Sequence, residues 1–182
     1  EGPKKMISRK SPTLFSYNPG WEAAVRKEFT EKGDESHLLL LDPSIDQLKT
    51  AVDSGLSMVT HFGNGCPVEL PRHDNVLQRF LSLRDQLWFC FIPDGAHVEF
   101  FALRNYLDLV GIERSIMTSD AISAARLGPG LHEISGITVE VDEEGVARRP
   151  GSLNFAGSTI TMPGILRNLF ERLALGEEEV SA

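Results

Sequence analysis

Short apolar runs recur along this sequence, and each is followed by a stretch whose apolar residues repeat with the period of an α-helix. The runs predicted as strands are 38–41, 55–60, 87–92 and 114–118. The helices predicted after them are 44–52, 74–83, 98–110 and 121–126. The strand-helix unit repeats at intervals of about 20 to 30 residues. This repeat predicts parallel strands joined by right-handed crossovers, which places the chain in the α/β class.

The segments outside this alternating region follow other patterns. Residues 1–20 are punctuated by proline and glycine and predict a loop, whereas 21–31 carries one apolar stripe and predicts an amphipathic helix. Farther along, 132–141 alternates in the manner of a β-strand, and Asp142–Gly145 resembles a hairpin turn. The apolar stripe over 162–175 predicts a last helix. We therefore expect a small antiparallel excursion before a C-terminal helix.

Composition excludes several classes of protein. With 41% hydrophobic and 24% charged residues, the chain has the make-up of an ordinary globular protein. Its formal net charge of -8 offers no broad basic surface to nucleic acid, and no apolar run reaches the roughly 20 residues that span a bilayer. We therefore expect a cytoplasmic protein without nucleic-acid or membrane partners. Cys66 and Cys90 form no Cys-x-x-Cys motif and are expected to be buried thiols.

A polar residue suited to metal or proton chemistry follows three of the predicted strands. These residues are His61, His97 and Asp120. Each taken singly has a structural interpretation, since a lone histidine is more often a structural residue, and Asp120 can cap the helix predicted at 121–126. Because the carboxyl ends of neighbouring parallel strands meet at one site in a barrel, the three residues together favour a shared active site.

Four sequence motifs surround these residues. They are Thr-His-Phe-Gly-Asn-Gly at 60–65, Pro-Asp-Gly-Ala-His at 93–97, Thr-Ser-Asp-Ala at 118–121 and Ala-Gly-Ser-Thr-Ile-Thr-Met at 156–162. In this order and spacing they resemble the N-acetylglucosamine-6-phosphate deacetylase family of the amidohydrolase superfamily. The opening Glu1-Gly2-Pro3 resembles a Glu-Gly-Pro of that family. The resemblance covers nearly the whole chain except the stretch 4–41.

The resemblance implies the (β/α)8 TIM barrel of metal-dependent hydrolases, represented here by an incomplete barrel, mainly its C-terminal half. A complete barrel needs on the order of 200 residues or more, typically about 250. Residues 1–182 then form one partial barrel domain. It consists of a poorly matched loop and helix (1–37), the barrel strands and helices (38–126), an antiparallel excursion with a substrate turn (127–161) and a C-terminal helix (162–182). We prefer a partial sequence of a complete enzyme to a truncated relative, because half a barrel would expose long unpaired strand edges.

The same resemblance implies the chemistry. The family hydrolyses the N-acetyl group of N-acetylglucosamine-6-phosphate to glucosamine-6-phosphate and acetate, using one or two divalent metals, usually zinc, with iron as the alternative. It makes Glu1 and His61 metal ligands. It makes Asp120 the catalytic acid and base, which takes a proton from metal-bound water and returns it to the leaving amine. His97, the second catalytic residue, would donate a hydrogen bond to the acetamide carbonyl, where charge develops.

Substrate contacts transfer in the same way. The resemblance places Asn64 and Gly65 against the sugar phosphate and matches Arg72 to a phosphate-binding arginine, a role that suits the planar guanidinium. An ordinary surface arginine is the structural alternative, and the adjacent His73 is the alternative phosphate partner. The turn Phe155-Ala156-Gly157 would close over the sugar, where glycine permits close approach of the backbone. The expected partners are a small amino-sugar phosphate, of glucosamine or its galactosamine isomer, and a second copy of the chain in a homodimer.

The family pattern breaks at one metal position. The family carries a further metal-binding histidine, and Leu40 stands in its place. His37 lies three residues upstream, where the alternation of a strand points its side chain to the opposite face. The departure keeps a second hypothesis open: a non-catalytic sugar-phosphate-binding protein, or an inactive barrel fragment, that has lost a metal ligand.

Overall fold

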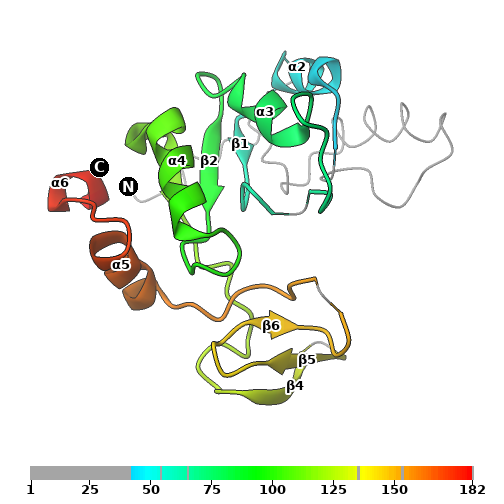
Figure 1. Cartoon of the computed structure of the whole chain (residues 1–182), viewed down its shortest axis with the longest axis vertical. Helices are drawn as coiled ribbons and strands as arrows, with labels where there is room; N and C mark the ends of the chain where they lie inside the picture. Colours follow the sequence, from blue (N-terminus) through cyan, green and yellow to red (C-terminus); the bar gives the residue numbers. More distant parts are fainter. Residues whose placement is uncertain (1–41, 54, 65, 135, 153, 182) are drawn as a thin grey trace, which may run out of the picture. The chain divides into compact units, whose positions relative to one another are not determined.

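The computed structural model describes residues 42–181 with the exception of 54, 65, 135 and 153 (Figure 1). Outside the described residues lie the predicted elements 21–31 and 38–41 and the positions Glu1, His37, Leu40 and Gly65. The chain divides into two compact units, Glu1–Cys90 and Phe91–Ala182, and the boundary falls within a strand. Each unit is described by itself.

Within its described residues, the first unit holds two helices and a parallel pair of strands. They are α2 (Ile45–Asp53), β1 (Met58–Val59), α3 (Val76–Leu81) and the beginning of β2 (Trp88–Phe91). Met58 lies opposite Trp88, and Val59 lies opposite Phe89. This pairing confirms the parallel arrangement predicted from the alternating runs, although β1 is shorter than the predicted 55–60.

Both of these helices begin at a side-chain cap. Ser44 and Gln47 form a capping box before α2: the Ser44 N–H donates to Gln47 Oε1 at 2.8 Å, and the Gln47 N–H donates to Ser44 Oγ at 3.3 Å. Asn75 caps α3, where its Oδ1 accepts from the Gln78 N–H at 3.0 Å. The helices predicted at 44–52 and 74–83 are thus confirmed, with ends set by these caps.

Phe62 anchors the loop after β1 in the core of the first unit. Its side chain is buried, and its ring packs edge-to-face against Phe80 at 6.3 Å and Phe89 at 5.0 Å between centroids. The Phe62 N–H also donates to the Cys90 carbonyl at 2.8 Å. Because both its ring and its backbone are held, the residue before it, His61, has a fixed position relative to the strands.

The second unit begins at the end of β2. Its helices and one of its strands are α4 (Phe100–Val110), the 3-10 helix η2 (Ile112–Arg114), β3 (Ser115–Met117), α5 (Met162–Glu171) and α6 (Glu177–Ser181). β3 is a neighbour of β2 in its sheet, and the Thr118 N–H donates to the Phe91 carbonyl at 2.9 Å. The helices predicted at 98–110 and 162–175 and the strand at 114–118 are confirmed, with slightly shorter bounds.

An antiparallel sheet of three strands follows in the second unit. It consists of β4 (Gly130–Ile134), β5 (Ile137–Val141) and β6 (Ala147–Arg148), in that order. The single strand predicted at 132–141 is therefore wrong, because the chain reverses near Gly136 (φ 78°) and β4 pairs with β5. The turn predicted at 142–145 is confirmed, since the Gly145 N–H donates to the Asp142 carbonyl at 3.0 Å.

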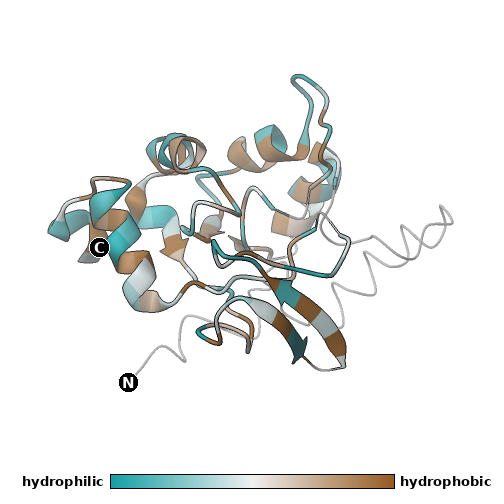
Figure 2. Ribbon diagram, turned by 60° about the horizontal axis from the view of Figure 1, so that its bottom comes forward, coloured by the Kyte–Doolittle hydropathy of each residue, from teal (hydrophilic) through white to brown (hydrophobic). Residues whose placement is uncertain are grey.

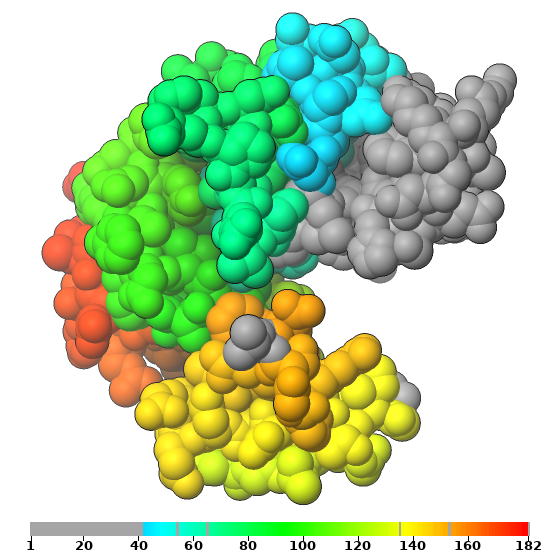
Figure 3. Space-filling model, turned by 45° about the vertical axis from the view of Figure 1, so that its right-hand side comes forward, coloured from blue at the N-terminus to red at the C-terminus, as the bar shows by residue number. Residues whose placement is uncertain are grey.

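Hydrophobic and hydrophilic residues alternate along β5 (Figure 2). The buried side of this sheet contributes Val139, Val141 and Ala147 to a small core that Ala124 completes. The space-filling view shows the same segment coloured yellow to orange (Figure 3). We call β4, β5 and β6 the hairpin sheet.

The helix predicted at 121–126 is wrong. Ala121 instead forms an isolated parallel bridge with Ser158, and the Ile122 N–H donates to the Ser158 carbonyl at 2.9 Å. Two tight turns follow, and Arg126 adopts a left-handed backbone with φ 72°. A helical pattern of six residues is too short to outweigh such a contact. Because no helix forms after Asp120, the interpretation of this residue as a helix cap is wrong.

The described residues thus have the α/β organisation that the sequence predicts, while the complete barrel and the division of the chain at 37, 126 and 161 stay predictions. Among these residues, no helix combines the length and the apolar character that crossing a bilayer requires.

Candidate functional site

Two of the predicted site residues have an unusual backbone. His61 follows β1 with φ 34°, and Asp120 follows β3 with φ 44°. A non-glycine residue with positive φ is uncommon, although aspartate and histidine tolerate it better than most. Such residues gather at functional sites, where the surrounding structure holds the strain. Within the described residues, Arg126 and Ala174 share this conformation without a predicted role.

The turn after β1 lines a small cavity in the first unit. The cavity has a volume of about 20 Å³ and is lined by His61, Asn64, Cys66 and core side chains of α3. The Asn64 N–H donates to the His61 carbonyl at 2.9 Å, which closes the turn. The amide Nδ2 of Asn64 is buried and has no hydrogen-bond partner among the described residues. This donor is unpaired among these residues but shielded, and the sugar-phosphate contact of Asn64 stays a prediction.

The two candidates for the phosphate partner lie just before α3. Arg72 and His73 are both exposed, and Arg72 forms no ion pair with another described residue. Arg79, by contrast, is held by Asp74 at 2.7 Å and by Asp42 at 2.6 Å. Arg72 is thus the less engaged of the two arginines, which is compatible with the role predicted for it.

His97 is held by a carboxylate in the loop between β2 and α4. Its Nδ1 lies 2.6 Å from Asp94 Oδ2, and its own N–H and the N–H of Ala96 donate to Asp94 Oδ1 at 2.9 Å. Burial alone would raise the pKa of Asp94, but the hydrogen bonds from His97 and Ala96 and the nearby imidazole outweigh it, and the pKa lies below its ordinary value of 3.8. Asp94 is therefore ionised at neutral pH.

The substrate turn predicted at 155–157 meets His97 in the second unit. The ring of Phe155 packs on the imidazole of His97, with 4.5 Å between centroids and 36° between planes. The guanidinium of Arg148 lies 5.0 Å from the centroid of the Phe155 ring, and Arg148 is itself paired with Asp142 at 3.0 Å. The structure thus brings together His97 and Phe155, which sequence motifs alone did not connect.

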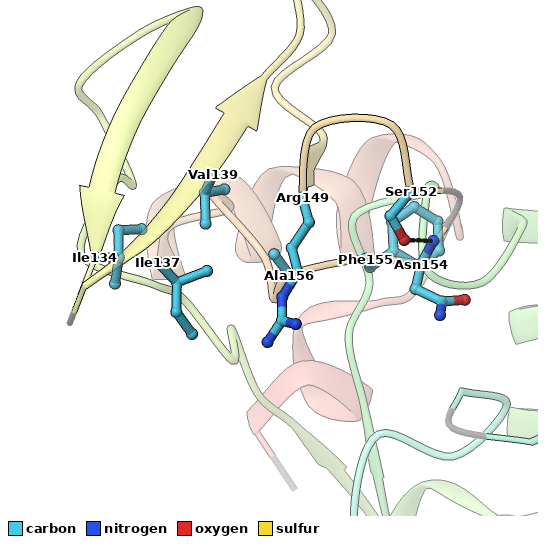
Figure 4. Close-up of a pocket in the computed structure, with 8 residues that line it drawn as sticks. All are labelled: Ile134, Ile137, Val139, Arg149, Ser152, Asn154, Phe155 and Ala156. Atoms are coloured by element: carbon cyan, nitrogen blue, oxygen red, sulfur yellow. Dashed lines mark hydrogen bonds between the residues drawn. The ribbon is translucent and has the colours of Figure 1, made fainter.

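Phe155 and Ala156 also line a larger cavity. Its volume is about 320 Å³, and the other lining residues are Ile134, Ile137, Val139, Arg149, Ser152 and Asn154 (Figure 4). The apolar residues come from the hairpin sheet, and the polar ones come from the segment that follows β6. A cavity of this size and mixed lining falls at the lower end of the range for small-molecule sites.

Asp120 and Gly157 lie side by side through their backbones. The Ser158 N–H donates to the Asp120 carbonyl at 3.0 Å, while the Asp120 side chain is exposed. Gly157 has φ +96°, and a Cβ there would lie 2.5 Å from Cγ2 of Ile122 and 3.3 Å from the Asp120 carbonyl oxygen. Only glycine fits this approach. The segment 155–158 therefore braces both Asp120 and His97.

The predicted metal ligands are only partly described. His61 lies at the end of β1, and Glu1 lies outside the described residues. Among the described residues, no three His, Cys, Asp or Glu side chains gather closely enough to hold a metal ion. The described residues therefore supply one candidate ligand, and the roles of Glu1 and His61 stay predictions.

Asp94 and Ser158 hold the site but were not among the predicted site residues. The signal for Asp94 was present, because an aspartate three residues before His97, with Gly95 between them, is typical of a side chain that caps its own turn. Ser158 carried no such signal, since its backbone pairing with Asp120 joins segments far apart in the sequence.

Comparisons with known proteins bear on these motifs. No protein-family model matches the sequence. The chain is 31% identical over 160 residues to N-acetylglucosamine-6-phosphate deacetylase from Lysinibacillus sphaericus, which covers 88% of this chain and 40% of that protein. It is 29% identical over 125 residues to N-acetylgalactosamine-6-phosphate deacetylase from Escherichia coli O157:H7, which covers 69% of this chain and 32% of that protein.

A solved structure extends the comparison to three dimensions. It is a mutant N-acetyl-D-glucosamine-6-phosphate deacetylase from Mycobacterium smegmatis in complex with N-acetyl-D-glucosamine-6-phosphate. The match has a TM-score of 0.70 at 24% identity and covers 93% of this chain and 44% of that one. The chain spans less than half the length of each of these relatives. Over that length it resembles N-acetylglucosamine-6-phosphate deacetylases in sequence and fold, which confirms the resemblance that its motifs carry.

Proposed function

We propose that the complete protein is a metal-dependent deacetylase that hydrolyses N-acetylglucosamine-6-phosphate to glucosamine-6-phosphate and acetate. The observation that carries the proposal is the turn after β3, where Asp120 is exposed, left-handed and braced by Ser158. A catalytic acid and base must be reachable by the substrate and fixed in position, and this turn meets both demands. The names of the curated relatives support the same reaction class.

The fold proposed for the complete protein is a (β/α)8 barrel. Support comes from the parallel pairing of β1 with β2, from the helices that follow these strands, and from the likeness to a solved deacetylase. In such a barrel the carboxyl ends of the strands face one site. The loops after β1, β2 and β3 would then carry His61, His97 and Asp120 to the same end.

Asp120 would move the proton of the reaction. Its carboxylate would accept a proton from the attacking water as the water oxygen bonds to the acetyl carbon. It would return the proton to the nitrogen as the carbon–nitrogen bond breaks, so that a free amine and acetate leave. An exposed carboxylate on a braced backbone is suited to both transfers, because it is accessible while its backbone stays in place.

His97 would stabilise the charge that develops on the acetamide oxygen. A hydrogen bond donated from its ring to this oxygen is worth more in the transition state than in the substrate, which is the condition for catalysis. Phe155 supports the ring from one face at 4.5 Å, and Gly157 permits the sugar to approach the backbone of the turn. Ala156 would complete the same turn over the sugar.

A divalent metal, zinc first and iron second, would be held by His61 and Glu1. His61 fits this role, because histidine is a common zinc ligand and its backbone is anchored through Phe62. When bound, a metal of this kind lowers the cost of generating hydroxide from water at neutral pH. Asn64, Gly65 and Arg72 would meet the sugar phosphate on the same side, with His73 as the alternative to Arg72.

Acetate release by the complete protein tests this function. The zinc-loaded protein is mixed with N-acetylglucosamine-6-phosphate, its galactosamine isomer or unphosphorylated N-acetylglucosamine. We expect release from the first, less from the isomer and least from the sugar without phosphate. The proposal fails if none of the three is hydrolysed. Binding of the phosphorylated sugar without hydrolysis and without stoichiometric zinc would instead favour the binding-only hypothesis raised by Leu40. The cytoplasmic location and the homodimer stay predictions.

A further inference from the structure

Asp94 makes more hydrogen bonds than its place outside the predicted site would suggest. Its Oδ1 accepts from the backbone N–H groups of Ala96 and His97, and its Oδ2 lies 2.6 Å from His97 Nδ1. The side chains of His97 and Asp94 are only 6% and 13% exposed. The loop has little freedom to move, because Asn168 Nδ2 donates to the Pro93 carbonyl at 2.8 Å. The pair is therefore a fixed, shielded unit.

The pair determines which ring nitrogen carries a proton. An ionised carboxylate only accepts hydrogen bonds, so the short contact requires a proton on Nδ1 of His97. In the neutral ring, Nε2 is then a bare acceptor. Nε2 donates a hydrogen bond only when the ring is doubly protonated. The buried carboxylate therefore ties the donor capacity of His97 to its charge.

Phe155 fixes the direction of the ring as well. Its own ring packs on the imidazole at 4.5 Å, and the Arg148 guanidinium lies on Phe155 at 5.0 Å. Two charged groups of the second unit are linked to His97 in this way. Asp94 contacts the imidazole directly, whereas Arg148 is separated from it by the Phe155 ring and is paired with Asp142.

We propose that Asp94 is a positioning residue: it keeps a proton on Nδ1 of His97, so that the doubly protonated ring presents an Nε2–H to the acetamide oxygen of the substrate. This inference rests on the proposed deacetylase function for the identity of the acceptor. The proton on Nδ1, in contrast, follows from the contacts of Asp94 alone. The two parts can be tested separately.

Asp94→Asn is the variant that reverses the arrangement. The amide oxygen can still accept from the backbone N–H groups of Ala96 and His97, so the loop keeps its shape. The amide nitrogen, placed opposite Nδ1, donates to it, and the ring proton moves to Nε2. Nitrogen-15 NMR of the histidine side chains, with the signal assigned through His97→Gln, should show the proton on Nδ1 in the wild-type protein and on Nε2 in Asp94→Asn.

Kinetics give a second readout that a merely structural role would not move. Asp94→Asn should lower kcat about 10- to 100-fold, the usual effect of removing a group that orients a catalytic residue, with a smaller change in KM.

Asp108→Asn is the matched control. Asp108 is also an aspartate of the second unit paired with a cation, Arg104, at 3.0 Å, and neither residue takes part in the contacts between Arg148, Phe155 and His97. This variant should leave the His97 signals and kcat unchanged.

The outcomes separate the two claims. A wild-type His97 with its only proton on Nε2 would overturn the positioning role, and this measurement needs no variant to fold. A tautomer and a kcat that are the same in Asp94→Asn and wild type would overturn it as well. If the tautomer switches as expected but no form of the protein releases acetate, the positioning of His97 is supported and the proposed function fails.

Discussion

The turns after β1 and after β3 use the same backbone conformation in opposite surroundings. His61 and Asp120 both have a positive φ, of 34° and 44°. His61 lies half-buried beside a cavity of about 20 Å³ and is followed by a core phenylalanine. Asp120 is exposed, and its backbone is held by Ser158 from a distant segment. One turn is secured from within the core, and the other is secured by a neighbouring strand-like segment.

The difference matches the two kinds of chemistry proposed. A metal ligand has to be kept still and shielded, so packing around His61 serves it well. A proton carrier has to reach water and substrate, so Asp120 cannot be buried in the same way. Bracing of the backbone leaves its side chain accessible while its position stays fixed. Backbone strain and side-chain burial therefore need not occur together at a site.

Asparagine at each position is the strongest test of this division. Asparagine adopts the left-handed conformation more readily than most residues, so Asp120→Asn and His61→Asn should each keep the free energy of unfolding of the metal-free protein within about 0.5 kcal/mol of wild type. Acetate release should fall about 100- to 10,000-fold in Asp120→Asn, with bound zinc retained. His61→Asn should lose zinc together with activity. Elemental analysis and steady-state kinetics decide, and equal zinc loss in both variants would contradict the assigned roles.

Gly157→Ala tests the bracing of the Asp120 turn. Both Gly157 and Gly151 have a positive φ, of 96° and 74°, but a Cβ meets Ile122 at position 157 and nothing within 4 Å at position 151. Gly151→Ala should therefore cost about 1 to 2 kcal/mol of backbone strain. Gly157→Ala should cost about 1 to 3 kcal/mol more from overpacking, and it should also lower kcat by displacing Asp120. Urea unfolding measures both, and equal costs would show that the close approach has no energetic weight.

Acid should reduce the stabilising contributions of two carboxylates, Asp94 and Asp74, by unequal amounts. The pKa of Asp94 lies below its ordinary value of 3.8, so its contribution to stability is present above that value and is lost as pH falls through the lowered pKa. Asp94→Asn should therefore weaken the acid dependence of unfolding as the pH falls from about 5 through the lowered pKa. The pKa of Asp74 is also lowered, by its hydrogen bond with Arg79, but that carboxylate is exposed and screened by water. Asp74→Asn should change the acid dependence less, and a larger effect at Asp74 would reverse the ranking.

The cysteines give the mildest probe of the first unit. Burial raises the pKa of Cys90 to about 11. Burial also raises the pKa of Cys66, although its own backbone hydrogen bond opposes this. Cys66 is half-buried beside the His61 turn, whereas Cys90 is buried. Iodoacetamide at about pH 8 should therefore modify Cys66 first, since the thiolate is the reactive form and access limits its reaction. Mass spectrometry of the digested protein measures the order, and faster modification of Cys90 would mean that β2 opens more readily than the turn.

Much of the fold could be predicted because the evidence for it is local. The helices at 44–52, 74–83 and 98–110 are confirmed, since apolar periodicity and capping residues such as Ser44 and Asn75 act within a few residues. The errors arise from contacts between distant segments. Ile122 bonds to Ser158 instead of starting a helix. The reversal near Gly136 divides one predicted strand into two.

The same distinction applies to the candidate site. The residues whose side chains are capable of metal or proton chemistry, His61, His97 and Asp120, could be selected from their motifs because residue type and order are written in the sequence. Their backbone strain could not be predicted, since neither His61 nor Asp120 is a glycine. The contact of His97 with Phe155 depends on tertiary structure that no local pattern encodes.

The left-handed backbone at positions 61 and 120 also has an evolutionary consequence. Codons for aspartate and for histidine each become an asparagine codon through one change at the first base. Asparagine is the residue that this conformation accepts best after glycine. A single mutation at either position could therefore silence the chemistry while the folded protein survives selection for stability. A binding protein descended from such an enzyme lies one step away, and sequences that carry asparagine at these positions would mark where that step was taken.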